Sequence, residues 1–458
     1  MKKLSRLTKI IYGAGDIGFS MTSTIIAAYF PIFLTDVIGL TPAIVAIALF
    51  IGKSWDYIND PLIGFISDRT RTRWGRRRPF LLFGAIPFAI AFMFLWWKPP
   101  FESHTALVVF YTVMFVVYDA ASTFVGMPYF ALTPELTEDY DERTELTGYR
   151  MFFSIVGGLI SFVVPMMIIG QMSPGNSGNV FQMGIIFGIA SAAPLLLVFF
   201  GTKEKPCFKK LERPKLFDSL KAALKNRPFV FSAVIYLFTW TSMAIIEANL
   251  LFYIKYVVQR EGLSEVIMAT IFVTAIISLP LWNWISKKFN KRQAYIYGIA
   301  FWAVVQIMLI TVSASSPLFY LLSLCVLAGI GVGAAHVLPW AMIPDAIEVD
   351  ELRTGERHEG MFYSLVTLAS KVANSIAVPL ALAVLDLTGY IPNAAVQPQS
   401  TLTGIRLVVG PIPALLLVGG IIFAIFYPLS RKEHHDMVQE LEIRRHNIEQ
   451  PKPTEESL

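Results

Sequence analysis

The chain has 458 residues, of which 55% are hydrophobic and 16% are charged, and its formal net charge is +5. Average soluble proteins have about 45–50% apolar and about 25% charged residues, so a chain of this length has too little polar surface to be soluble. The composition therefore excludes a disordered protein, a disulfide scaffold and almost any ordinary cytosolic enzyme. It predicts a protein with many membrane spans.

Twelve apolar runs follow one another along nearly the whole chain. Each is long enough to cross a bilayer as a helix, which needs about 20 residues. The predicted fold class is therefore an all-α membrane protein with transmembrane helices at about 10–36, 42–67, 80–97, 106–133, 147–170, 181–201, 228–256, 263–286, 293–313, 318–343, 359–389 and 404–429.

Positive charge is concentrated on one side of this topology. The N-terminus, the even-numbered connections and the C-terminal tail together hold 32 of the 38 Lys and Arg residues. Because cytoplasmic segments carry an excess of Lys and Arg, both termini are predicted to be cytoplasmic. We expect a multi-pass protein of the plasma (inner) membrane.

Two connections have counterparts about half a chain later. The basic stretch at 67–79 matches a shorter one at 286–292, and Met127-Pro128-Tyr129 matches Leu338-Pro339-Trp340. A parallel repeat of this kind predicts two pseudo-symmetric six-helix bundles, as in major facilitator transporters. We expect an N-terminal bundle at 1–201, a cytoplasmic basic linker at 202–227, a C-terminal bundle at 228–429 and a cytoplasmic tail at 430–458.

Six ionisable side chains lie inside the predicted spans: Lys53, Asp56 and Asp60 in span 2, Asp119 in span 4, Glu247 in span 7 and Lys371 in span 11. Each charge costs about 2.5–3.5 kcal/mol near the centre of a membrane helix, so these groups must pair, become neutral or line a wet cavity. Asp119 and Glu247 are candidates to bind substrate or to form gating pairs.

Asp56 and Asp60 are four residues apart and share one face of a helix. They predict an oxygen-ligand site for Na⁺ or a paired proton acceptor, with Asn59 as a further ligand. Lys53 and Lys371 are the expected counter-charges, and Lys371 would neutralise the acids when no cation is bound. The alternative is an ion pair that only holds helices together.

The arginines between Arg69 and Arg78 form a strong orientation signal. Arg76, Arg77 and Arg78 are also candidates to pair with acids between Glu135 and Glu145, Glu142 among them, and so to gate the cytoplasmic side.

Several classes of chemistry are missing from the sequence. It has no nucleotide-binding glycine loop, no metal-ligand cluster and no nucleophile elbow. An ion gradient is therefore the expected driving force, with no catalytic residues and no cofactor beyond a transported Na⁺ or H⁺. We expect membrane lipids and a small-molecule substrate as partners, no nucleic acid, a monomer, and free thiols at Cys207 and Cys325.

The stretch Trp55-Asp56-Tyr57-Ile58-Asn59-Asp60-Pro61, followed by Trp74-Gly75-Arg76-Arg77-Arg78-Pro79, resembles the glycoside–pentoside–hexuronide:cation symporter family, as do Thr367 and Lys371. This resemblance implies a twelve-helix cation-coupled symporter, usually for sugars or glycosides. In the melibiose permeases of the family both acids of the motif serve the cation site, which implies that role for Asp56 and Asp60, and the family's span-11 lysine matches Lys371.

The sugar-binding positions implied by the resemblance differ. The family's aspartates of spans 1 and 4 fall at Ser20 and Gly126, the aromatic after the latter is Phe130, and the span-5 arginine corresponds to Arg150. This disfavours a melibiose-like galactoside. Asp16 and Asp119, one and about two turns away, are candidates to supply displaced polar contacts for another sugar.

The chain also resembles the sodium-dependent lysophosphatidylcholine symporter branch, on Met127-Pro128-Tyr129, the segment from Glu142 to Met151, and Glu247. The leading hypothesis is a sugar or glycoside:cation symporter that works by alternating access. The alternative is a symporter of a lysophospholipid or another amphiphile, and a third is a transport-dead sensor or a membrane enzyme. The candidate substrate-binding residues are Ser20, Asp119, Gly126, Phe130, Arg150, Glu247 and Thr367.

Overall fold

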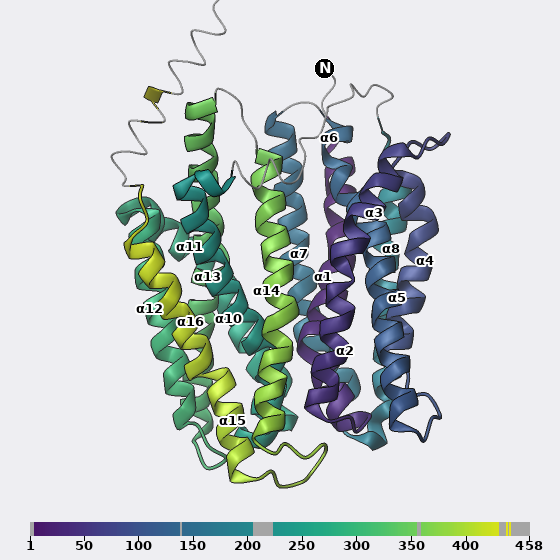
Figure 1. Cartoon of the computed structure of the whole chain (residues 1–458), viewed down its shortest axis with the longest axis vertical. Coiled ribbons are helices and arrows are strands. Elements are labelled where there is room, and N and C mark those ends of the chain that lie inside the picture. The colour runs from purple at the N-terminus through teal and green to yellow at the C-terminus, as the bar shows by residue number, and fades with distance from the viewer. Residues whose placement is uncertain are drawn as a thin grey trace, which may run out of the picture.

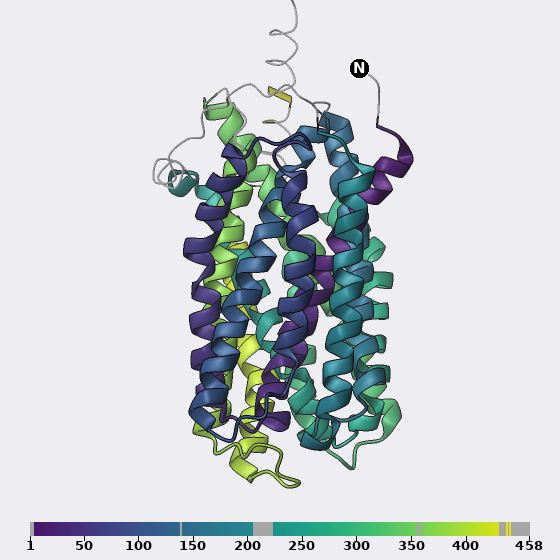
Figure 2. The same cartoon turned by 90° about the vertical axis from the view of Figure 1, so that its right-hand side faces the viewer.

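A computed structural model describes residues 4–137, 140–204, 223–354, 359–429, 437, 439 and 440. Long helices run nearly parallel to one another and form a single bundle (Figures 1 and 2). We name the end of the bundle where α1 begins and α16 ends the terminal end, and the opposite one the far end.

The first half of the chain supplies the purple and blue helices of Figure 1. They are α1 (Arg6–Ile32) with the π-helix η1 (Phe33–Val37), α2 (Pro42–Ser54), α3 (Asp56–Arg69), α4 (Arg78–Leu95), α5 (His104–Ala131), α6 (Thr133–Leu136), α7 (Tyr140–Ile169), η2 (Pro174–Asn176) and α8 (Ser177–Gly201).

The second half supplies the teal, green and yellow helices. They are α10 (Arg227–Phe252) with the π-helix η3 (Tyr253–Val258), η4 (Glu261–Leu263), α11 (Ser264–Phe289), α12 (Lys291–Met308) with η5 (Leu309–Thr311), α13 (Leu318–Thr354), α14 (Glu359–Leu387), α15 (Gln399–Val409) and α16 (Pro411–Ile425).

Eleven of the described segments are long and apolar enough to cross a membrane. The remaining predicted span, which is the second in the chain at 42–67, is present as two helices, α2 and α3, which meet at Trp55. The prediction of one unbroken helix there was wrong. The Trp55 N–H bonds to the carbonyl of Gly52, three residues back, and the polar residues Asp56, Asn59 and Asp60 follow directly.

Helix ends follow the local sequence. Asn226 accepts a hydrogen bond from the Phe229 N–H and caps α10, while Asn290 accepts one from Gln293 and caps α12. The predicted end of the tenth span at 343 was too early, because α13 continues to Thr354. This extension is polar and projects at the terminal end in Figure 1.

Packing between helices positions the central residues. Within the halves, α1 packs on α7 and α8, and α11 packs on α13, where a side chain at Gly329 would meet the Ile271 carbonyl. Across the halves, α2 packs on α14, α1 on α10, and α7 on α11. The proposed division at 201, 227 and 429 stays a prediction, because most of the linker and the tail lie outside the described residues, as does Cys207.

Candidate functional site

Two acids of α3 meet one lysine of α14 where the halves pack together. The Nζ of Lys371 lies 2.5 Å from Oδ2 of Asp60 and 3.3 Å from Oδ1 of Asp56. The hydroxyl of Tyr57 also reaches across, 2.5 Å from the hydroxyl of Ser375. The predicted neighbours Asp56, Asp60 and Lys371 are thus brought together, although their role in cation binding stays a prediction. We refer to Asp56 and Asp60 as the carboxylate pair.

The carboxylate pair lies deep in the bundle. Asp56 begins α3, thirteen residues before its end at Arg69, or about 20 Å at 1.5 Å per residue. Lys371 is twelve residues into α14, or about 18 Å from the same terminal end. Because α2 ends at Ser54, Asp56 lies in the first turn of a new helix, where the helix dipole stabilises negative charge.

The facing helix α5 completes the polar cluster. The hydroxyl of Thr123 donates to Oδ1 of Asp60 at 3.1 Å. Asp119 lies one turn earlier on the same face of α5, within hydrogen-bonding reach of Asp56, and is 6% exposed. Asp119, a candidate for substrate binding or a gating pair, lies beside the carboxylate pair, and either role stays a prediction. The sequence reasoning missed Thr123, whose spacing of four residues from Asp119 was the available signal.

Two polar atoms in this cluster are unsatisfied. Within the described ranges, Nδ2 of Asn59 and Oδ2 of Asp119 are buried without a hydrogen-bond partner. Lys53 lies nearby with its ammonium 5.6 Å from the ring of Phe115. Among the described residues, no group of three or more His, Cys, Asp or Glu side chains is arranged to hold a metal ion. A cation here would therefore need neutral oxygens besides carboxylates.

The candidate substrate residues of the first half form an aromatic wall with one ion pair. Nε of Arg150 lies 3.2 Å from Oδ2 of Asp16. The same guanidinium lies over the rings of Phe130 and Tyr129, at 4.6 Å and 5.5 Å. Phe19 packs on both rings.

The two positions that lack the family's acids contribute no charge to this wall. Ser20 donates to the carbonyl of Ser154 at 2.5 Å. A side chain at Gly126 would meet the rings of Phe19 and Phe130. The structure thus groups Ser20, Gly126, Phe130 and Arg150 around α1, α5 and α7.

In the second half, Glu247 of α10 and Thr367 of α14 differ in their bonding. Thr367 donates to the carbonyl of Tyr363 in its own helix. Glu247 is half-buried, and in the part of the chain that the structure describes it makes no hydrogen bond or ion pair. A carboxylate left unpartnered at this depth has a high cost unless a ligand pairs with it.

The candidate gating residues pair within the first half. Nε of Arg76 and Nε of Arg77 lie 2.7 Å and 3.0 Å from the same oxygen of buried Glu135. Arg78 instead donates to the carbonyl of Phe199. Its backbone N–H bonds to Glu204, as do those of Arg76 and Arg77, so that one carboxylate caps α4. A gating role for the three arginines stays a prediction.

Glu142 joins the start of α1 to the start of α7. Its carboxylate lies 3.3 Å from Nζ of Lys9 and accepts hydrogen bonds from the Thr137 hydroxyl and the Leu4 N–H. Burial alone would raise the pKa of Glu142, but these hydrogen bonds outweigh it and hold the pKa below its ordinary value of 4.5.

This shift predicts a pH dependence of stability. Because the pKa of Glu142 is lower in the folded protein, its contribution is present above about pH 4.5 and is lost as the pH falls through the lowered pKa. We expect Glu142→Gln to melt at a lower temperature than the parent at pH 7, and the difference to shrink below pH 4.5. Thermal unfolding of both proteins in detergent measures it. A difference that stays constant with pH would contradict the assignment.

At the far end, one fully buried carboxylate joins the halves. Asp36 accepts hydrogen bonds from Nζ of Lys255 at 2.5 Å, from the hydroxyls of Tyr256 and Tyr390, and from the N–H of Asn393. We name this cluster the Asp36 clasp. The sequence reasoning did not predict it.

Two further carboxylates strengthen this contact. Glu261 accepts from the Met172 N–H at 2.7 Å, and Asp386 accepts from the Ala43 N–H at 3.2 Å. In both, the carboxylate comes from the second half and the N–H from the first. Asp36, Glu261 and Asp386 therefore hold the two halves together at the far end.

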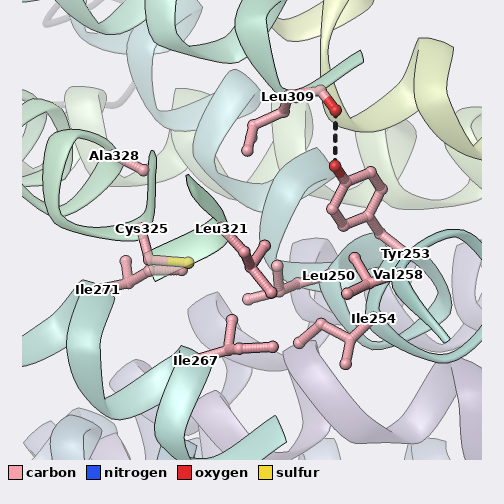
Figure 3. Close-up of a pocket in the computed structure, with 10 residues that line it drawn as sticks. All are labelled: Leu250, Tyr253, Ile254, Val258, Ile267, Ile271, Leu309, Leu321, Cys325 and Ala328. Atoms are coloured by element: carbon pink, nitrogen blue, oxygen red, sulfur yellow. Dashed lines mark hydrogen bonds between the residues drawn. The ribbon is translucent and has the colours of Figure 1, made fainter. Parts of the chain in front are cut away.

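A small apolar pocket lies beside η3 in the second half. The close-up in Figure 3 shows its lining of Leu250, Tyr253, Ile254, Val258, Ile267, Ile271, Leu309, Leu321, Cys325 and Ala328, with the Tyr253 hydroxyl bonded to the Leu309 carbonyl. Cys325 is a free, buried thiol, as predicted. None of the predicted site residues lines this pocket.

Known proteins match this chain over nearly its whole length. The model of the MFS/sugar transport protein family matches residues 11–431. An uncharacterized symporter of Synechocystis sp. is 32% identical over 97% of this chain and 98% of its own length. The sodium-dependent lysophosphatidylcholine symporter 1-A of Danio rerio is 29% identical over 98% of this chain and 91% of its own length.

A solved structure is similar in fold. The crystal structure of a D-xylose-proton symporter has a TM-score of 0.67 and covers 92% of this chain and 97% of that one. The two sequences are 15% identical, so this likeness concerns the arrangement of the helices alone.

Proposed function

Because this chain belongs to the MFS/sugar transport protein family, we propose that it is a cation-coupled symporter whose cargo is an amphiphile with a zwitterionic headgroup. It is a multi-pass membrane protein with the major facilitator fold and a symporter of that superfamily. The cation, the cargo and the cytoplasmic placement of both termini are the parts that we propose.

The observation that carries the coupling is the contact of Lys371 with the carboxylate pair. In the cation-free carrier the ammonium group of Lys371 balances the charge of acids that would otherwise lie without a counter-charge at membrane depth. A bound Na⁺ takes over that task, with Asn59 and Thr123 as neutral oxygen ligands. The sodium dependence of the Danio rerio relative favours Na⁺ over H⁺.

The described state is closed at the far end by the Asp36 clasp. With both termini in the cytoplasm, this is the state that faces the cytoplasm. Cation and cargo are then coupled, because the binding of each favours the state in which the helices close around the central residues. The two halves rock about the carboxylate pair to present it to the opposite side.

The proposed cargo class is supported by the residues around Arg150 on α7 and by Glu247, which lies deeper in the bundle on α10 of the other half. The aromatic wall suits an apolar surface, the guanidinium of Arg150 suits a phosphate, and the unpartnered carboxylate of Glu247 suits a quaternary ammonium group. A lysophosphatidylcholine-like molecule carries all three features. The lack of acids at Ser20 and Gly126 removes groups that would bind sugar hydroxyls.

A sugar or glycoside is the second candidate. The motif from Trp55 to Pro61 and the description of the family favour it. In that case Asp16 and Arg150 would bind hydroxyl groups rather than a headgroup. Coupling through the carboxylate pair is common to both candidates.

Uptake into proteoliposomes distinguishes them. With an inward Na⁺ gradient, we expect uptake of radiolabelled lysophosphatidylcholine and none of a panel of radiolabelled mono- and disaccharides. Glu247→Gln should lower lysophosphatidylcholine uptake about 100-fold, since the quaternary ammonium group would then lie without a counter-charge at membrane depth, at a cost of about 2.5–3.5 kcal/mol.

Glu102→Gln is the matched control, because it removes an exposed acid outside the site. Uptake of a sugar with no uptake of the lysolipid would replace the amphiphile by the second candidate. Uptake that ignores both Na⁺ and H⁺ gradients would contradict the proposed coupling.

A further inference from the structure

Two π-helices lie at equivalent places in the two halves. η1 (Phe33–Val37) continues α1, and η3 (Tyr253–Val258) continues α10. Their first residues are 220 positions apart, which agrees with the offset of the internal repeat. π-Helices make up well under 1% of residues in proteins and frequently mark functional sites. Two of them in equivalent positions therefore need a reason.

The π-helices carry the two charges of the Asp36 clasp. Asp36 lies in η1 and Lys255 in η3, and their side chains form an ion pair between the halves. The Asp36 carboxylate is fully buried, and Lys255 also donates to the carbonyl of Met172 at 2.6 Å. Tyr256, the next residue of η3, gives Asp36 a further donor.

From this arrangement, the geometry points to η1 and η3 as paired hinges of the transport cycle, held closed at the far end by Asp36 and Lys255 as positioning residues. The inference rests on the proposed alternating access, and it adds the residues that control one of its two end states. The carboxylate pair and the cargo residues lie elsewhere in the bundle and are not part of the clasp.

A π-turn contains one more residue than an α-turn. Asp36 is the fourth of the five residues of η1, and Lys255 is the third of the six residues of η3. Conversion of either segment to an α-helix therefore turns these side chains relative to the preceding helix, by up to about 100°, the angle between neighbouring residues of a helix with 3.6 residues per turn. Such a rotation takes Asp36 and Lys255 away from each other. The pocket of Figure 3 borders η3 through Tyr253, Ile254 and Val258.

The clasp also explains why the closed far end can reopen. A buried ion pair contributes little net stability compared with apolar packing, because desolvation of the two charges offsets their attraction. Removal of one partner, in contrast, leaves a buried charge alone and strongly favours the state in which water reaches it. The populations of the two end states should therefore respond steeply to changes at Asp36.

Hydrogen–deuterium exchange of the full-length protein in nanodiscs tests the hinges without any cargo. For Asp36→Asn and for Lys255→Gln, we expect exchange at 33–40 and at 253–260 to become about tenfold faster or more. Because opening of one end closes the other, exchange at 131–137 and at 340–350 of the terminal end should become slower.

The opposite signs at the two ends separate a hinge from a general loss of stability. Asp345→Asn is the matched control, since Asp345 pairs with Lys291 within the second half at the terminal end, and it should not speed exchange at the π-helices. If Asp36→Asn does not fold, Tyr390→Phe removes one donor to Asp36 and should give a smaller change with the same pattern.

Faster exchange at only one π-helix, or faster exchange at both ends, would overturn the inference. Either result leaves the proposed symport untouched, because Na⁺-driven uptake depends on the carboxylate pair. Loss of Na⁺-driven uptake together with the expected exchange pattern at the π-helices would contradict the proposed symport and leave the hinges supported. The two failures are therefore distinguishable.

Discussion

Replacement of Asp56 or Asp60 by Asn is expected to lower gradient-driven accumulation of cargo by about 10- to 100-fold, within the usual range of coupling energies between two ligands. Both acids contact Lys371, and Asp60 also accepts from Thr123. With one acid neutral, the remaining carboxylate and Lys371 already balance each other, so a cation has little to gain by displacing the ammonium. Accumulation of radiolabelled cargo in vesicles with and without a Na⁺ gradient measures the effect.

The control must remove an acid of the same half without touching the site. Glu102 is exposed in the connection before α5, and Glu102→Gln should accumulate cargo as the parent does. Downhill flux should survive in Asp56→Asn and Asp60→Asn, because the route through the protein is intact. Undiminished uphill uptake by both variants would remove the carboxylate pair from the coupling mechanism.

Much of the fold was predictable from local sequence. Membrane helices need long apolar runs, and these are visible without any tertiary information. The break at Trp55 was not predictable, because the residues at 42–67 form one continuous apolar run. The change from α2 to α3 also depends on the contacts of polar side chains with other helices. The π-helices were equally invisible, since η1 and η3 consist of residues that suit an α-helix.

The central site was predictable to the extent that it contains charges. Asp56, Asp60, Asp119 and Lys371 are conspicuous in apolar spans, whereas Thr123 is not, because a threonine causes no penalty in a membrane helix. The place of Asp119 beside Asp56 was not predicted, and its role in substrate binding stays a prediction. The depth of a residue along its own helix can be counted from the sequence, but the sequence does not tell which helix packs against that residue.

The Asp36 clasp shows the limit of such reasoning. Asp36 falls at the end of an apolar run, where a charge has no cost and suggests no function. Its partners Lys255 and Tyr390 lie 219 and 354 residues away in sequence, in segments that meet only when the halves close. Only the structure joins these residues.

Lys371→Gln gives the sharpest test of how the empty carrier returns. In the cation-free state Lys371 pairs with both acids, with contacts of 2.5 Å and 3.3 Å. Without it, the empty carrier must move two uncompensated acids through the closed centre, at about 2.5–3.5 kcal/mol for each charge. The loaded carrier does not meet this barrier, since the bound cation neutralises the acids.

Net uptake by Lys371→Gln is therefore expected to fall about 100-fold or more, while exchange of cargo across the membrane continues at a rate close to that of the parent. Net uptake needs the empty carrier to return, whereas exchange cycles only through loaded states. Radiolabelled cargo in preloaded and in empty proteoliposomes separates the two fluxes. Lys371→Arg keeps the charge and should retain part of the net uptake. Equal loss of net uptake and exchange would show that Lys371 serves cargo binding or folding instead of the return of the empty carrier.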